Sequence, residues 1–210
     1  MRTIGRGTPI TITAHLTSPI VGMERVMLDG PVAWAWAMRA KKEGRPLPRI
    51  TAEYAPDFPL PFARWDAQGA WGWCVSEGAE EVVSWTMIQV RRKPNTYAMS
   101  RFAKDKKHHA GIGPFKARDV TLPGRLVETI KWEALVTDED ELMMLLSSLT
   151  NISGRWHNGF GQVSHWDVER NPGARDGWMN RPLPSPTGTR EIPIRPPYWH
   201  SSRMALCADR

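Results

Sequence analysis

The stretch "LVETIKWEALVTDEDELMMLLSSL", residues 126–149, decides the fold because its hydrophobic period changes partway along it. Residues 126–136 alternate apolar and polar side chains, which is the period of a strand with one buried face. Residues 138–149 place leucines at the i, i+3, i+4 and i+7 spacing of a helix, with acidic residues at its start. We expect Thr137 or Asp138 to cap that helix. The stretch therefore predicts a strand followed by a helix.

Two further elements are predicted upstream. Residues 10–16, "ITITAHL", alternate in the same way and predict a first strand, with His15 and the threonines on its exposed face. The segment "LDGPVAWAWAMRAKKEG" predicts a helix at about residues 30–43. Asp29 is expected to cap it, and Pro31 suits its first turn.

The remaining elements complete the order. Residues 45–64 are rich in proline and predict an extended connection. Residues 71–76 and 81–92 predict two strands joined by a turn at 77–80, and residues 162–169 predict a last strand. The order of strand, helix, strand region, strand, helix and strand predicts an α+β, ferredoxin-like (RRM-like) arrangement.

The C-terminal residues 171–210 differ from the rest because they are rich in proline and keep little apolar periodicity. We expect an extended C-terminal tail, which packing on a partner could order, beside one domain of residues 1–170. No stretch approaches the roughly 18 apolar residues of a membrane span, and the N-terminal residues lack a signal-peptide pattern. We therefore expect a soluble, cytoplasmic protein without membrane contact.

Cofactor and metal sites are not expected. Cys74 and Cys207 stand far apart in the sequence, without the spacing of a zinc site or a disulfide framework. The acidic residues of "TDEDE" head a predicted helix, where they complement its dipole, so they do not indicate a metal-dependent nuclease.

The positive charge is concentrated in one segment of the chain. The formal net charge is +6, and residues 91–125 hold ten Lys and Arg against two Asp, whereas the rest holds eighteen against twenty acidic residues. The same segment contains histidines and aromatic residues. This composition is typical of a phosphate-binding surface with stacking groups available.

Three glycines lie close together in "GRWHNGFGQV", residues 154–163. The segment joins a helix to a strand and lacks the nucleotide-binding fingerprints, so a mononucleotide or NAD site is not expected. Two interpretations stay open. The glycines could let a polyanion approach the main chain, with Arg155 and His157 reaching phosphates and Trp156 or Phe160 stacking on a base. Alternatively, they only form a tight turn between helix and strand.

The glycine segment, the last strand, the helix start "LDGPVAWAWAMRA" and the basic segment resemble the RAMP superfamily of CRISPR-associated RNA-binding proteins. The resemblance spans about residues 8–170. Within that superfamily, the sequence is similar in particular to the Cas-five-like subunit of a type IV CRISPR effector complex. It implies a RAMP fold in which residues 91–125 form a basic thumb. The thumb and the glycine loop, residues 153–162, would hold the repeat-derived 5′ handle of the guide RNA (crRNA).

The residues expected to contact RNA fall into two groups. In the thumb they are Arg91, Arg92, Lys93, Arg101, Phe102, Lys104, Lys106, Lys107, His108, His109, Lys116 and Arg118. In the glycine loop they are Gly154, Arg155, Trp156, His157, Gly159, Phe160 and Gly161.

The resemblance implies a non-catalytic subunit that caps the 5′ handle in a ribonucleoprotein complex for DNA interference against viruses or plasmids. The implied partners are a Cas-seven-like backbone subunit, a large subunit, an RNA-processing endonuclease subunit, a DNA helicase and target DNA near the protospacer. Two alternatives stay open. A metal-independent endoribonuclease acting on repeat RNA would use His157 as its acid or base, and a generic RNP-associated protein would need only the basic segment.

Overall fold

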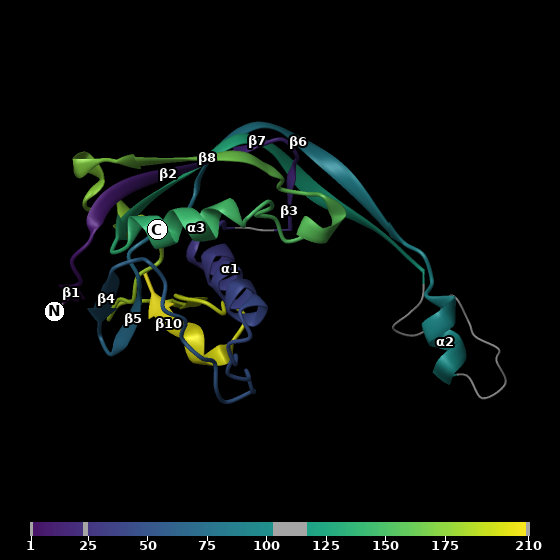
Figure 1. Cartoon of the computed structure of the whole chain (residues 1–210), viewed down its shortest axis with the longest axis horizontal. Coiled ribbons are helices and arrows are strands. Elements are labelled where there is room, and N and C mark those ends of the chain that lie inside the picture. The colour runs from purple at the N-terminus through teal and green to yellow at the C-terminus, as the bar shows by residue number, and fades with distance from the viewer. Residues whose placement is uncertain (1, 23–24, 103–116, 209–210) are drawn as a thin grey trace.

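The computed structural model describes residues 2–22, 25–102 and 117–208, which form a mixed α/β structure with antiparallel sheets (Figure 1). The main sheet has the strand order β8–β2–β7–β6, and β3 lies beside β7 in the continuation of β2. Every paired neighbour in this sheet is antiparallel. Its strands are β2 (Thr8–Leu16), β3 (Ile20–Val21), β6 (Ala79–Arg92), β7 (Arg118–Val136) and β8 (Val163–Arg170).

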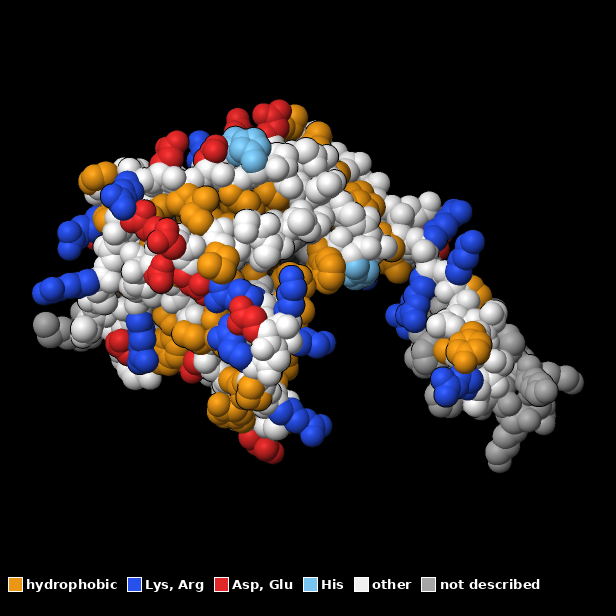
Figure 2. Space-filling view, in the orientation of Figure 1, with side chains coloured by type: hydrophobic (Ala, Val, Ile, Leu, Met, Phe, Trp, Pro, Cys, Tyr) orange, Lys and Arg blue, Asp and Glu red, His pale blue; other side chains and the backbone are white. Residues whose placement is uncertain are grey.

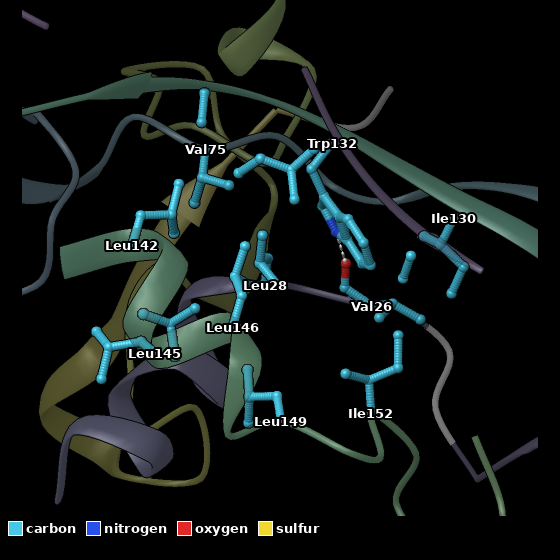
Figure 3. Packing of buried hydrophobic residues seen from close by; sticks show 14 of the residues in the cluster. Val26, Leu28, Val75, Ile130, Trp132, Leu142, Leu145, Leu146, Leu149 and Ile152 are labelled. Atoms are coloured by element: carbon cyan, nitrogen blue, oxygen red, sulfur yellow. Dashed lines mark hydrogen bonds between the residues drawn. The ribbon is translucent and has the colours of Figure 1, made fainter. Parts of the chain in front are cut away.

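Two helices, α1 (Asp29–Lys42) and α3 (Glu139–Ser147), lie under one face of the main sheet (Figure 1). The buried core between them contains the four leucines predicted for the second helix, none more than 3% exposed (Figure 3). Trp132 of β7 enters the same core, where its indole N–H donates to the Val26 carbonyl at 2.8 Å. Asp138 caps α3 by accepting from the Glu141 amide at 2.9 Å, as predicted. No helix among the described residues is long and apolar enough to cross a membrane.

The strands β6 and β7 continue beyond the other strands as a two-stranded arm that leads to α2 (Thr96–Phe102) (Figure 1). The sequence predicted a strand starting at residue 126, but β7 begins at Arg118. Residues 118–127 pair with β6, so the flank of the basic segment is itself strand. The ladder hydrogen bonds of this pairing override the weak apolar pattern of the flank.

The sequence predicted two strands at residues 71–76 and 81–92 joined by a turn, and both segments contain a strand, but the two strands do not pair with each other. The first of these segments forms β5 (Ala70–Trp73), which pairs with β4 (Arg64–Ala67) across the turn residues Gln68 and Gly69. Both turn residues have positive φ, 53° and 75°, which is the requirement of the tight hairpin turn that matches strand twist. β1 (Arg2–Ile4) adds a third strand to this small sheet.

The C-terminal residues do not extend away from the protein, contrary to the expected tail. They form three short 3₁₀ turns and a strand pair, and they pack against β4, β5 and neighbouring residues in a second core. Trp178 and Cys207 are fully buried there. The packing therefore comes from the same chain. The elements are η2 (Pro172–Ala174), η3 (Gly177–Met179), β9 (Arg190–Pro193), η4 (Ser201–Arg203) and β10 (Met204–Cys207).

Arg181 fixes this segment to the body. Its guanidinium is 1% exposed and donates to the carbonyls of Trp73 and Val75, both at 2.9 Å, and to that of Ile194 at 2.6 Å. Because these carbonyls belong to segments far apart in the sequence, one side chain connects the C-terminal residues to the strand region before β6.

Asp29 is the charged partner of Arg181, and it does not cap α1 as predicted. The N-cap residue is Leu28, which makes no side-chain capping bond. The Asp29 carboxylate is fully buried and accepts from the Tyr198 hydroxyl and from Arg181, the latter at 3.4 Å. Burial raises the pKa of Asp29 above its ordinary value. The Arg181 charge and the Tyr198 hydrogen bond oppose this shift but do not cancel it. Burial and the adjacent Asp29 raise the pKa of Tyr198 well above its ordinary value, so the phenol stays a donor.

We predict that Asp29→Ala lowers the free energy of unfolding by about 3–5 kcal/mol, because it leaves the Arg181 charge buried without its partner. Urea denaturation of the purified protein measures this change. Asp66→Ala is the control, since the Asp66–Arg64 pair is half-exposed on both sides and its loss costs less than about 1 kcal/mol. Equal losses from the two variants would contradict the role assigned to Asp29.

Candidate nucleic-acid interface

The glycine loop, residues 153–162, is held against the turn between β2 and β3. The Gly161 amide donates to the Pro19 carbonyl at 2.8 Å. The Ser18 hydroxyl donates to the Gly159 carbonyl, also at 2.8 Å. These bonds fix the main chain of the loop at the end of the main sheet.

The two glycines with positive φ serve different purposes. Gly161 has φ of 63° and is buried, and a Cβ at this position would lie 2.5 Å from the Ser153 Cβ. Its packing matches the tight-turn interpretation. Gly159 has φ of 86°, but it is exposed and a Cβ there would meet nothing within 4 Å. The space beside the Gly159 Cα therefore stays open to an extended ligand, while its carbonyl and amide bond to Ser18 and Trp156.

The side chains of the loop point mainly to solvent. Arg155 and His157 are exposed, as the polyanion interpretation requires, whereas Phe160 is half-buried. Trp156 is 49% exposed, and its ring centroid lies 5.6 Å from that of Trp34 in α1. Trp156 is therefore more available for stacking than Phe160. Trp34 was missed in the sequence, because its helical context favours a buried role.

A groove of about 240 Å³ runs between the start of α1 and the glycine loop. Its walls are mostly apolar, and both tryptophans are among the residues that line it. Aromatic and apolar walls of this kind suit the face of a planar ring. The lining includes Gly30, Pro31, Trp34, Ile152, Gly154 and Trp156.

The arm carries exposed cations at its far end. Tyr97 is 74% exposed on α2, and the Arg101 guanidinium lies 5.9 Å from its ring centroid. Arg91 lies 3.3 Å from the Asp119 carboxylate across the two strands, a pair that solvent largely screens. The predicted contact residues that are exposed here are Arg91, Arg92, Lys93, Arg101 and Arg118.

Other predicted contact residues of the thumb lie outside the described residues. They are Lys104, Lys106, Lys107, His108, His109 and Lys116. Phe102 ends α2, and its backbone alone is described.

The arm and the body face each other across a hollow, with Lys and Arg side chains on both sides of it (Figure 2). On the body side, α1 ends with Lys41 and Lys42, which are exposed. The sequence analysis left these two lysines out of the site. The signal that could have found them is the basic run "RAKK" at the end of a helix whose first turn borders the glycine loop.

The root of the arm combines a neutralised charge with exposed apolar groups. Arg125, within the basic segment, forms two hydrogen bonds to Glu80 at 2.6 and 2.7 Å, and both side chains are mostly buried. Trp85 and Met87 of β6 are 68% and 67% exposed. Arg125 therefore stabilises the arm through Glu80. The count of charged residues in the sequence did not reveal the apolar surface that Trp85 and Met87 form.

His157, the expected acid or base of the ribonuclease alternative, contacts the Trp156 ring edge-on, with centroids 5.8 Å apart. Within the described residues, nothing hydrogen-bonds to its imidazole. General acid–base catalysis needs the proton-transferring group to be within hydrogen-bond reach of its partners when substrate is bound.

Comparison with known families gives one match over most of the chain. The model described as CRISPR type IV associated protein Csf3 matches residues 8–209. This range includes the C-terminal residues that the sequence resemblance, spanning about 8–170, left out. No curated protein matches the chain.

We predict that Gly161→Ala destabilises the protein more than Gly159→Ala, although both glycines have positive φ. A left-handed conformation costs a non-glycine residue about 1–2 kcal/mol at either position, and only Gly161→Ala adds the clash with Ser153. Thermal unfolding of the two variants measures the difference. The assignment of Gly161 to packing would be wrong if Gly159→Ala were the less stable variant.

Proposed function

We propose that this chain, which belongs to the Csf3 family of type IV CRISPR-associated proteins, binds the 5′ handle of the guide RNA. Membership of the family associates the chain with a type IV CRISPR system. The observation that carries the proposal is the hollow between arm and body, with cations on both sides (Figure 2). A single-stranded polyanion is the ligand that such a surface attracts.

Each part of the interface has a separate role in this proposal. Exposed cations such as Arg92 and Lys93 on the arm, and Lys41 on the body, neutralise phosphates. The open space beside the Gly159 Cα lets the RNA backbone approach closely. Trp156 and Trp34 stack on one base at the groove, which would orient the handle without reading a long sequence.

The strand order supports the ferredoxin-like RAMP assignment within this proposal. Without β3, the order across the main sheet is β8, β2, β7 and β6. Along the chain, these are the fourth, first, third and second strands of a strand–helix–strand–strand–helix–strand sequence. A split βαβ arrangement has this strand order, which supports the pattern expected from the sequence. The arm of β6, α2 and β7 then corresponds to the thumb, inserted between the second and third of these strands.

We propose a non-catalytic role, in which the chain caps the handle and joins a larger complex. The proposed partners are the backbone subunit, the large subunit, the RNA-processing endonuclease, the helicase and target DNA beside the protospacer. The exposed apolar side chains at the root of the arm are suited to contact one of the protein subunits.

We predict that Arg91→Ala/Arg92→Ala/Lys93→Ala weakens binding of repeat RNA and flattens its salt dependence. The slope of log K against log salt falls by about 0.7 for each phosphate of a single strand that the protein no longer neutralises. Gel-shift titrations in EDTA at several salt concentrations measure it. Lys131→Ala, which removes an exposed cation from the outer face of the sheet, is the matched control and keeps the slope.

An unchanged slope in the triple variant would exclude Arg91, Arg92 and Lys93 from the interface. The same samples run on a denaturing gel separate binding from cleavage, and we expect intact RNA. A discrete cut within the repeat, abolished in His157→Ala, would instead favour the endoribonuclease.

We predict that Trp156→Ala weakens RNA binding by about 1–3 kcal/mol, because it removes the ring available for stacking. The salt slope should stay unchanged, since the substitution removes no cation. Trp199→Ala is the matched control, because Trp199 is 73% exposed in the C-terminal segment, outside the groove. Equal affinities of the two variants would show that the groove does not hold a base.

A further inference from the structure

Three potential metal ligands meet on the outer face of the main sheet, where β2 and β8 lie side by side. His15 lies directly opposite His165 in the antiparallel register. Asp167 is two residues beyond His165, so it projects from the same face of the strand. The alternate residues of β2, such as Ala14, are buried against the helices, which places His15 on the opposite side. Figure 2 shows histidine and acidic side chains gathered on this face.

The three side chains are already close to one another. The imidazoles of His15 and His165 are stacked, with centroids 4.0 Å apart and planes 9° from parallel. The Nε2 atom of His15 lies 2.8 Å from an Asp167 carboxylate oxygen. One ligand atom from each of the three residues lies within 4.8 Å of the other two.

We propose that His15, His165 and Asp167 form a binding site for a divalent transition-metal ion of the zinc type. Two imidazole nitrogens and one carboxylate oxygen are donors that Zn²⁺ accepts, at about 2.0–2.2 Å. A tetrahedral ion at such distances separates its donors by roughly 3.4 Å. No pair of donors therefore needs to approach by more than about 1.4 Å, the His15 Nε2–Asp167 pair needs to open slightly from 2.8 Å, and the stacked rings need to tilt toward the ion.

The exposure of the side chains permits that adjustment. The His15 and Asp167 side chains are 31% and 51% exposed, and His165 is exposed as well. Three protein ligands leave a fourth position of a tetrahedral ion open, for water or for a donor from another molecule.

The arrangement has no evident structural task. A pair between an exposed carboxylate and a histidine contributes less than about 1 kcal/mol to stability. The imidazole of His165 contacts the Ser164 hydroxyl and the His15 ring, neither of which is a buried group. None of the three residues belongs to the proposed RNA interface. The expectation of no metal site rested on cysteine spacing and acidic runs, which do not detect histidines joined by sheet register.

Calorimetric titration of the full-length, tag-free protein with Zn²⁺ alone tests the site. We expect one saturable site in the wild type, and His165→Ala and Asp167→Asn each to weaken its Kd by about tenfold or more. Far-ultraviolet circular dichroism checks that both variants keep the fold. The control is His108→Gln/His109→Gln, which removes the adjacent histidines of the basic segment and should leave the Kd unchanged.

Two results would overturn the proposal. The first is wild-type Zn²⁺ affinity in folded His165→Ala and Asp167→Asn. The second is loss of binding in the His108/His109 control, which would place the ion on the basic segment instead.

Discussion

The buried ion pair between Asp29 and Arg181, completed by the Tyr198 hydroxyl, is the interaction on which the rest of the structure depends. It joins the first turn of α1 to the C-terminal segment and, through Arg181, to the carbonyls that precede β6. The groove begins one residue later, at Gly30, where a Cβ would lie 3.5 Å from the Tyr198 ring. The position of the groove therefore depends on residues that are distant in sequence, and these residues lie within the range that the family model matches.

The elements predicted correctly are those whose signal is local and periodic. The leucine stripe of α3 and the alternation in β2 specify a helix and a strand, because each buries one face against the same core. The incorrect predictions concern residues whose partners are distant in the sequence. Asp29 was interpreted as a helix cap, since nothing near it in the sequence reveals a buried arginine 152 residues later. The C-terminal segment lacks a long periodic pattern because it packs through separated residues such as Trp178, Ile194 and Cys207, and through the Arg181 hydrogen bonds.

The candidate site was predictable to a similar extent. Composition identified the exposed cations of the arm, and glycine spacing identified the loop, because both are properties of contiguous residues. Trp34 was not found, since a tryptophan in a helix is ordinarily buried, and only the fold shows that it is partly exposed and lies beside Trp156. His15 and His165 are 150 positions apart in sequence, and their contact follows from strand register alone.

The arm has an energetic consequence for assembly. Residues 118–123 of β7 pair, within the described part of the chain, only with β6. A two-stranded ribbon without a third neighbour is marginally stable, so its hydrogen bonds open at a lower free energy than those of the central strands. The outer part of the arm can therefore open locally without disturbing the register of β2 and β7. In the proposed RNA-binding role, such a local opening would not require global unfolding of the protein.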